Sequence, residues 1–136
     1  MKKYLITLFF ILSFAAAKAQ SPDTIITKGE PIYIAVQETA VFSGGMEKMY
    51  KYLGNELTYP EIEKKYNIQG KVYITFVVEK NGSLSDFKIL KSVTKDIDAE
   101  AIRVMKASPK WIPGKQNGVP VRQQYTMAIT FSLQNN

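Results

Sequence analysis

The chain has 136 residues, carries 18 Lys and Arg against 12 Asp and Glu, and contains neither Cys nor His. Without Cys there are no disulfides or thiol nucleophiles, and without His the usual general base and the commonest metal ligand are missing. A chain of this length supports one small domain with a single core. We therefore expect a binding domain rather than an enzyme, with no cofactor and no metal ion.

The N-terminus has the pattern of a secretory signal peptide. Lys2 and Lys3 precede the apolar run 4–17, and Ala17-Lys18-Ala19 fits an A-x-A cleavage site. The run is shorter than the roughly 20 apolar residues that span a bilayer. Residues 1–19 are therefore predicted to be a signal that is cleaved after Ala19, with a retained membrane anchor as the alternative.

Residues 20–41 read as a polar leader that contains one short apolar run, Ile32–Val36, a possible edge strand. After Gly44-Gly45, apolar residues recur with helical spacing and predict one apolar face. Tyr59-Pro60 ends this helix, and a second short helix is expected over 61–66, closed by Asn67 in the left-handed region. The apolar face consists of Met46, Met49, Tyr50, Leu53 and Leu57.

A strand is predicted over 71–79 because apolar residues alternate there, with Val72, Ile74, Phe76 and Val78 on one face. Asn81-Gly82 predicts a type I′ hairpin turn. In the following strand the alternation slips by one residue between Leu84 and Phe87, which predicts a β-bulge.

A second main helix is expected to begin at Asp98 as N-cap, with Ile97 and Ile102 as a hydrophobic staple, and to end before Pro109. Capping explains Asp98 and Glu100 better than a cation site does. The last strand is predicted over 119–133, with Tyr125, Met127, Ile129, Phe131 and Leu133 on its apolar face.

These elements predict an α+β fold in which two main helices pack on one face of a three-stranded antiparallel sheet. Lysines interleave with acidic residues along the chain, so no basic patch for nucleic acid is expected. Trp111 is interpreted as packing over the core rather than as a binding anchor.

A series of short motifs in 42–133 resembles the C-terminal domain of TonB, and Phe42-Ser43-Gly44-Gly45 resembles the variant common in Bacteroidetes. We assign 42–136 to this domain. The motifs are Tyr59-Pro60, Ile68-Gln69-Gly70-Lys71-Val72, Phe76-Val77-Val78-Glu79-Lys80-Asn81-Gly82, Asp98-Ala99-Glu100-Ala101, Trp111-Ile112-Pro113-Gly114-Lys115, Gly118, Pro120-Val121 and Ile129-Thr130-Phe131.

The resemblance implies a periplasmic domain that grips the TonB box or plug of an outer-membrane TonB-dependent receptor by pairing an edge strand with it. It also implies contact of the full-length family members with inner-membrane motor proteins. Carried over to this chain, the expected edge runs over 129–134. The expected peptide-binding residues are Glu56, Tyr59, Pro60, Ala128, Ile129, Thr130, Phe131, Ser132, Leu133 and Gln134.

Three functions stay open on the sequence. The first is a free-standing periplasmic domain that binds receptor segments by strand addition. The second is a membrane-anchored energy transducer that retains residues 1–19. The third is a structural domain whose sheet edge pairs with a second copy to form a homodimer.

Overall fold

The computed structural model describes residues 24–25 and 29–133, so the predicted signal peptide and Gln134 lie outside the described part. Within that part, no helix is long and apolar enough to cross a membrane. In chain order the elements are β1 (Thr24–Ile25), β2 (Ile32–Tyr33), α1 (Gly45–Glu56), α2 (Glu61–Lys65), β3 (Gly70–Val78), β4 (Leu84–Lys91), α3 (Lys95–Lys106), β5 (Lys115–Gln116), β6 (Val119–Pro120) and β7 (Arg122–Phe131).

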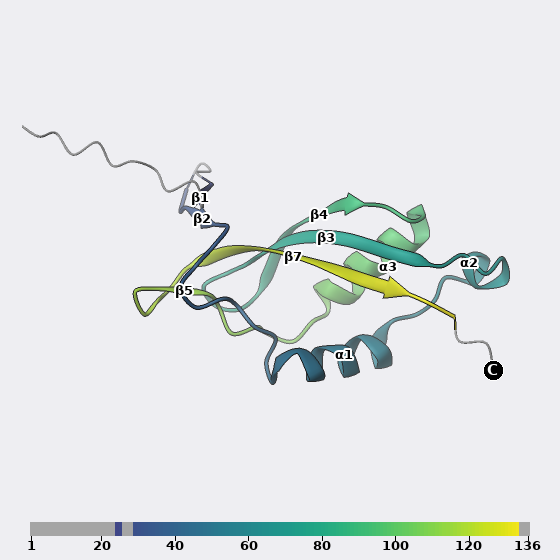
Figure 1. The fold of residues 1–136 in the computed structure, drawn as a ribbon, viewed down its shortest axis with the longest axis horizontal. Coiled ribbons are helices and arrows are strands. Elements are labelled where there is room, and N and C mark those ends of the chain that lie inside the picture. The colour runs from purple at the N-terminus through teal and green to yellow at the C-terminus, as the bar shows by residue number, and fades with distance from the viewer. Residues whose placement is uncertain (1–23, 26–28, 134–136) are drawn as a thin grey trace, which may run out of the picture.

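The predicted α+β fold is confirmed, although the sheet has five strands rather than three, in the order β1-β2-β7-β3-β4. The three long strands, β7, β3 and β4, are antiparallel neighbours. The two-residue strands β1 and β2 extend the sheet, and β2 joins it by parallel pairing with the start of β7. Helices α1 and α3 lie on the same side of the sheet (Figure 1).

The alternation predicted for the central strands is confirmed. Val72, Ile74, Phe76 and Val78 are fully buried on the helix side of β3, as is Ile129 of β7. On the opposite face, Thr75 and Val77 are also buried, although alternation alone predicts an exposed face there. Ile25 and Ile32 of the N-terminal segment line a pocket together with Thr75 and Val77.

The hairpin between β3 and β4 contains the predicted bulge but not the predicted turn. The pairing shifts between Thr75 and Val77, and Asp86 has a φ of 51° at that point. In the turn only Gly82 has a positive φ, 84°, whereas a type I′ turn needs two such residues. The chain instead forms a β-turn closed by a bond from the Gly82 N–H to the Glu79 carbonyl, followed by left-handed Gly82.

Helix α3 begins earlier than predicted. Its N-cap is Thr94, whose side chain accepts a hydrogen bond from the Ile97 N–H. Asp98, the predicted cap, lies inside the first turn, where its carboxylate accepts a hydrogen bond from the Val93 N–H. Both residue types cap helices well. With Thr94 as the cap, Ile97 lies in the first turn of α3 and is buried.

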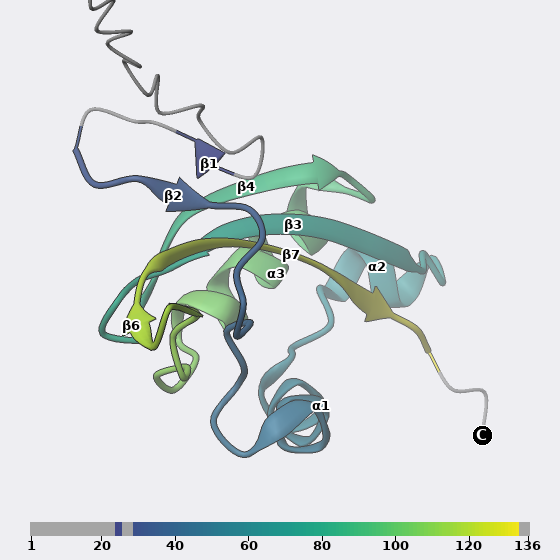
Figure 2. The same ribbon diagram turned by 60° about the vertical axis from the view of Figure 1, so that its left-hand side comes forward.

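Helix α1 is fixed to α3 at its C-terminal end. The Tyr52 hydroxyl donates a 2.8 Å hydrogen bond to the Val104 carbonyl, and burial raises the pKa of this phenol. Arg103 donates to the Glu56 carbonyl at 2.9 Å. Glu100 accepts from the Thr58 N–H at 2.8 Å, and its ion pair with Arg103 holds the pKa of its carboxyl below the usual value. These contacts place α1 beside α3 rather than directly on β7 (Figure 2).

Candidate peptide-binding groove

Strand β7 presents an open sheet edge over most of its length. Two of its ten residues pair with β2, so Gln124–Phe131 have only β3 as a strand neighbour among the described residues. In an antiparallel pair, alternate residues turn their N–H and C=O groups toward the partner strand. The remaining residues of β7 therefore turn theirs toward the open side.

The opposite edge of the sheet is less suitable for strand pairing. Strand β4 is interrupted by the bulge at Asp86, and bulges of this kind twist an edge away from regular pairing. By contrast, β7 pairs with β3 over nine consecutive positions without a register shift. The regular edge is therefore that of β7.

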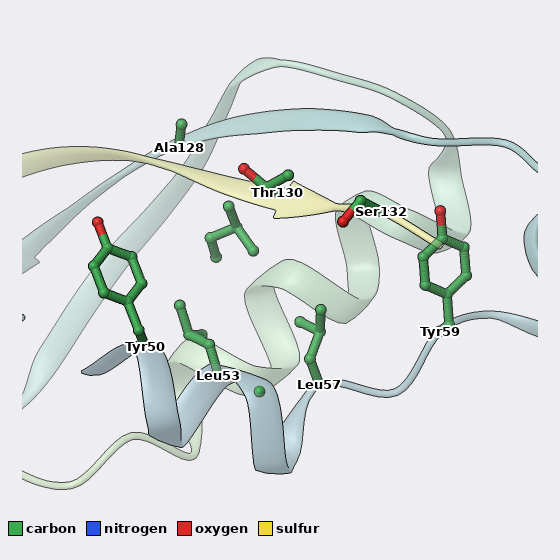
Figure 3. Close-up of a pocket in the computed structure, with 9 residues that line it drawn as sticks. Tyr50, Leu53, Leu57, Tyr59, Ala128, Thr130 and Ser132 are labelled. Carbon is green, nitrogen blue, oxygen red and sulfur yellow. The ribbon is translucent and has the colours of Figure 1, made fainter. Parts of the chain in front are cut away.

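A groove of about 480 Å³ lies between this edge and α1. Tyr50, Leu53 and Leu57 point from α1 toward β7 (Figure 3). The wall on the sheet side is formed by the C-terminal half of β7 and the residues after it. The complete lining is Tyr50, Leu53, Gly54, Leu57, Tyr59, Ala128, Ile129, Thr130 and Ser132.

The α1 side of the groove was not predicted to be a site, because its apolar spacing indicates a core-facing helix. Met49 fulfils that expectation and is buried. Tyr50 and Met46 do not, because they remain 64% and 46% exposed. The spacing shows that α1 has an apolar face, but only the anchoring of α1 on α3 shows that part of this face is left uncovered beside β7.

Tyr59 joins the two strands at one end of the groove. Its hydroxyl donates a hydrogen bond to the Ile68 carbonyl, just before β3. Its ring packs edge to face against Phe131 at the end of β7, with the ring centroids 5.8 Å apart. Burial raises the pKa of the Tyr59 phenol, and the Glu63 carboxylate adds to this rise. The residue thus supports the edge strand and also contributes to the groove wall.

The expected binding residues of β7 divide between its two faces. Ile129 and Phe131 are buried toward the helices, whereas Ala128, Thr130 and Ser132 are exposed. Ile129, Ala128, Thr130 and Ser132 line the groove. The strand ends at Phe131, two residues before the predicted end, and the Leu133 N–H is bonded to the Gln69 side chain at 2.8 Å.

Two of the other expected residues lie away from the groove. The exposed Glu56 ends α1, and its carbonyl is engaged by Arg103. Pro60 is the N-cap of α2 and lines a different surface hollow, beside Glu100 and Arg103. Among the expected residues, the structure therefore brings Tyr59 together with the end of β7.

The groove is uncharged, and its lining combines apolar side chains with hydroxyl groups. No Lys, Arg, Asp or Glu is among its lining residues, and its polar groups are hydroxyls and backbone atoms. Burial of apolar side chains from a bound segment would therefore supply affinity, and the open edge would supply direction through backbone hydrogen bonds. This combination suits an extended, uncharged peptide.

The sequence of residues 55–133 matches the family described as Gram-negative bacterial TonB protein C-terminal. The chain belongs to this family. The match begins at the C-terminal end of α1 and continues past the end of β7. It thus includes all three long strands, α3 and the β7 wall of the groove.

The chain is also similar to TonB proteins in sequence and to TonB C-terminal domains in fold. The TonB proteins of two Helicobacter pylori strains are each 24% identical over 108 residues, 75% of this chain. The chain spans only 36% and 37% of their length. A solution structure of the H. pylori TonB C-terminal domain has a TM-score of 0.53 at 21% identity, covering 67% of this chain and 96% of that domain. A longer form of the same domain gives a TM-score of 0.50 at 19% identity, covering 67% of this chain and 82% of that form.

Proposed function

We propose that this protein is a periplasmic TonB-like domain that binds a TonB-box-like segment of an outer-membrane receptor by strand addition, in TonB-dependent transport. Its action is binding and not catalysis. The observation that carries this proposal is the open edge of β7, among the described residues, beside an uncharged groove lined in part by apolar side chains. Membership of the TonB C-terminal family supports the same function.

The geometry supports strand addition in three ways. Residues Gln124–Phe131 offer eight positions for pairing, which matches a short extended peptide. β2 already occupies the start of this edge, so an added strand would begin beyond Gln123. Tyr50, Leu53 and Leu57 stand beside the edge, where they would contact alternate side chains of the added strand.

A chemical-shift titration tests the proposal. Peptides from the periplasmic N-termini of outer-membrane receptors are added to the labelled domain. We expect shifts to concentrate on Gln124–Phe131 and on the α1 side of the groove. Absence of shifts at β7 with every peptide would contradict the proposal.

A matched pair of variants separates groove contacts from general surface effects. Tyr50 is 64% exposed and lines the groove, whereas Tyr66 is 67% exposed and lies after α2. Removing an aromatic anchor costs on the order of 1–2 kcal/mol of binding, so Tyr50→Ala should weaken the binding of a responsive peptide by roughly fivefold to thirtyfold. Tyr66→Ala should leave its affinity unchanged.

Two other functions use the same features. An open β7 edge also permits pairing with a second copy, which sedimentation at varied protein concentration would detect as a concentration-dependent dimer. Similarity to TonB proteins supports a membrane-anchored transducer that contacts inner-membrane motor proteins. Fractionation distinguishes it from the periplasmic form, because release from membranes without detergent contradicts an anchored chain.

A further inference from the structure

Gly54 is an unusual residue for its position in the fold. It lies inside α1, three residues before the C-cap Leu57, where glycine is less favourable than alanine by up to about 1 kcal/mol. A glycine is normally kept in such a position for one of two reasons. Either the backbone adopts a positive φ, or a neighbouring atom leaves no room for a Cβ atom.

Neither reason applies to Gly54. Its φ lies outside the left-handed region, so it is not the glycine that ends many helices. A Cβ atom on Gly54 would meet nothing within 4 Å outside its own helix and chain neighbours. All eight glycines of the chain lie in the described part, and each of the other seven has a positive φ or a neighbour that close.

The open space beside Gly54 belongs to the groove. Tyr50 lies one helical turn before Gly54 on the same face of α1, and Leu53 and Leu57 lie on the adjacent row. All four residues line the groove opposite the end of β7. Gly54 is thus a gap in a row of large side chains, directly across from the open edge.

We infer that Gly54 is a specificity-determining residue, which leaves room for one large apolar side chain of an extended, uncharged partner segment paired with β7. This inference rests on the proposed function and adds the identity of the side chain that the groove selects. The lining offers no charged group to pair with a charged side chain, and the bordering Tyr50, Leu53 and Leu57 favour an apolar one. Because the partner strand alternates, only side chains on the α1 side of that strand reach this gap.

The test uses a capped octapeptide of alternating Thr and Ala, and a set of variants that carry Leu at each position in turn. Wild-type protein should bind at least one Leu variant about tenfold or more tightly than the parent peptide, because Leu buries additional apolar surface. Gly54→Ala should reduce this preference, and Gly54→Leu should abolish it.

Stability measurements distinguish a loss of binding from a loss of folding. Gly54→Ala should raise Tm, because alanine is the better helix former and meets no neighbour. Asn55→Ala is the matched control, since Asn55 is an exposed neighbour in α1 outside the groove lining. It should leave the Leu preference intact.

The outcomes distinguish this inference from the function on which it rests. If wild type prefers Leu at one position and both Gly54 variants keep that preference, the inference is overturned and strand addition stands. If wild type binds the peptides at β7 without any Leu preference, the inference is likewise overturned. If no receptor peptide or octapeptide shifts β7, the proposed function and the inference fail together.

Discussion

Tyr59→Phe tests how the end of the groove is held together. The Tyr59 hydroxyl donates a hydrogen bond to the Ile68 carbonyl, and the ring packs against Phe131 with its plane tilted by 74°. The substitution removes the hydroxyl and keeps the ring contact. It therefore isolates the hydrogen bond that ties the loop before β3 to the support of β7.

The expected loss of stability follows from the type of hydrogen bond. A neutral hydrogen bond contributes about 1 kcal/mol net, and removal of its donor leaves the Ile68 carbonyl without this partner. For a small domain with a urea m-value of roughly 1–2 kcal/mol/M, the unfolding midpoint should fall by about 0.5–1 M. The m-value itself should stay unchanged, because the fold is retained.

Tyr66→Phe is the control for this measurement. Tyr66 is 67% exposed, and its hydroxyl has no hydrogen-bond partner among the described residues. Its removal should leave the urea midpoint within experimental error of wild type. Equal midpoints for Tyr59→Phe and Tyr66→Phe would refute the assignment of Tyr59 as a structural support of the groove.

Three further outcomes are expected. Burial raises the pKa of the Tyr59 phenol, so the unfolded state loses the phenol proton at a lower pH than the folded state does. The free energy of unfolding should therefore fall above about pH 10. Tyr59→Phe should reduce that fall in alkaline urea titrations. The hydrogen bond from Arg122 holds the pKa of Glu79 below 4.5. The ionised Glu79 carboxylate therefore stabilises the fold above pH 4.5, and this stabilisation is lost as the pH falls through the lower folded pKa. Glu79→Gln should make the free energy of unfolding depend less on pH in this range, as measured by urea titrations. Gly82→Ala should lower the free energy of unfolding by about 2 kcal/mol or more, because φ is 84° and the Cβ would lie 2.0 Å from a backbone carbonyl oxygen. Gly118→Ala, with a φ of 75° and no such neighbour, should lower the free energy of unfolding clearly less. Thermal unfolding of both variants measures the difference.

The sequence predicts the strands well because alternation identifies the side chains that face the helices. Val72, Ile74, Phe76 and Val78 lie where the period of two places them, and the slip before Phe87 corresponds to a real bulge. The residue types at turns and helix caps predict the turn type and the capping residue less reliably. Asn81-Gly82 is compatible with more than one turn, and the turn that forms lets the Gly82 carbonyl accept a hydrogen bond from Trp111.

The groove could be predicted only in part. The β7 side follows from an apolar last strand and from the family resemblance, whereas the α1 side depends on a tertiary arrangement. The helical spacing predicts that both Met49 and Tyr50 face the core, yet Met49 is buried and Tyr50 is 64% exposed. The difference arises because Tyr52 and the turn after Glu56 are bonded to α3, which holds α1 away from β7.

Hydrogen–deuterium exchange at β7, with and without a saturating receptor peptide, tests the central claim most directly. Amide protons of Gln124–Phe131 that point to the open side have no strand partner among the described residues, so they should exchange quickly in the free protein. Strand addition predicts that these same amides become protected when the peptide binds, while those of Leu84–Lys91 on the bulged edge do not change. Protection confined to β4, or shifts at α1 without any protection at β7, would contradict the account.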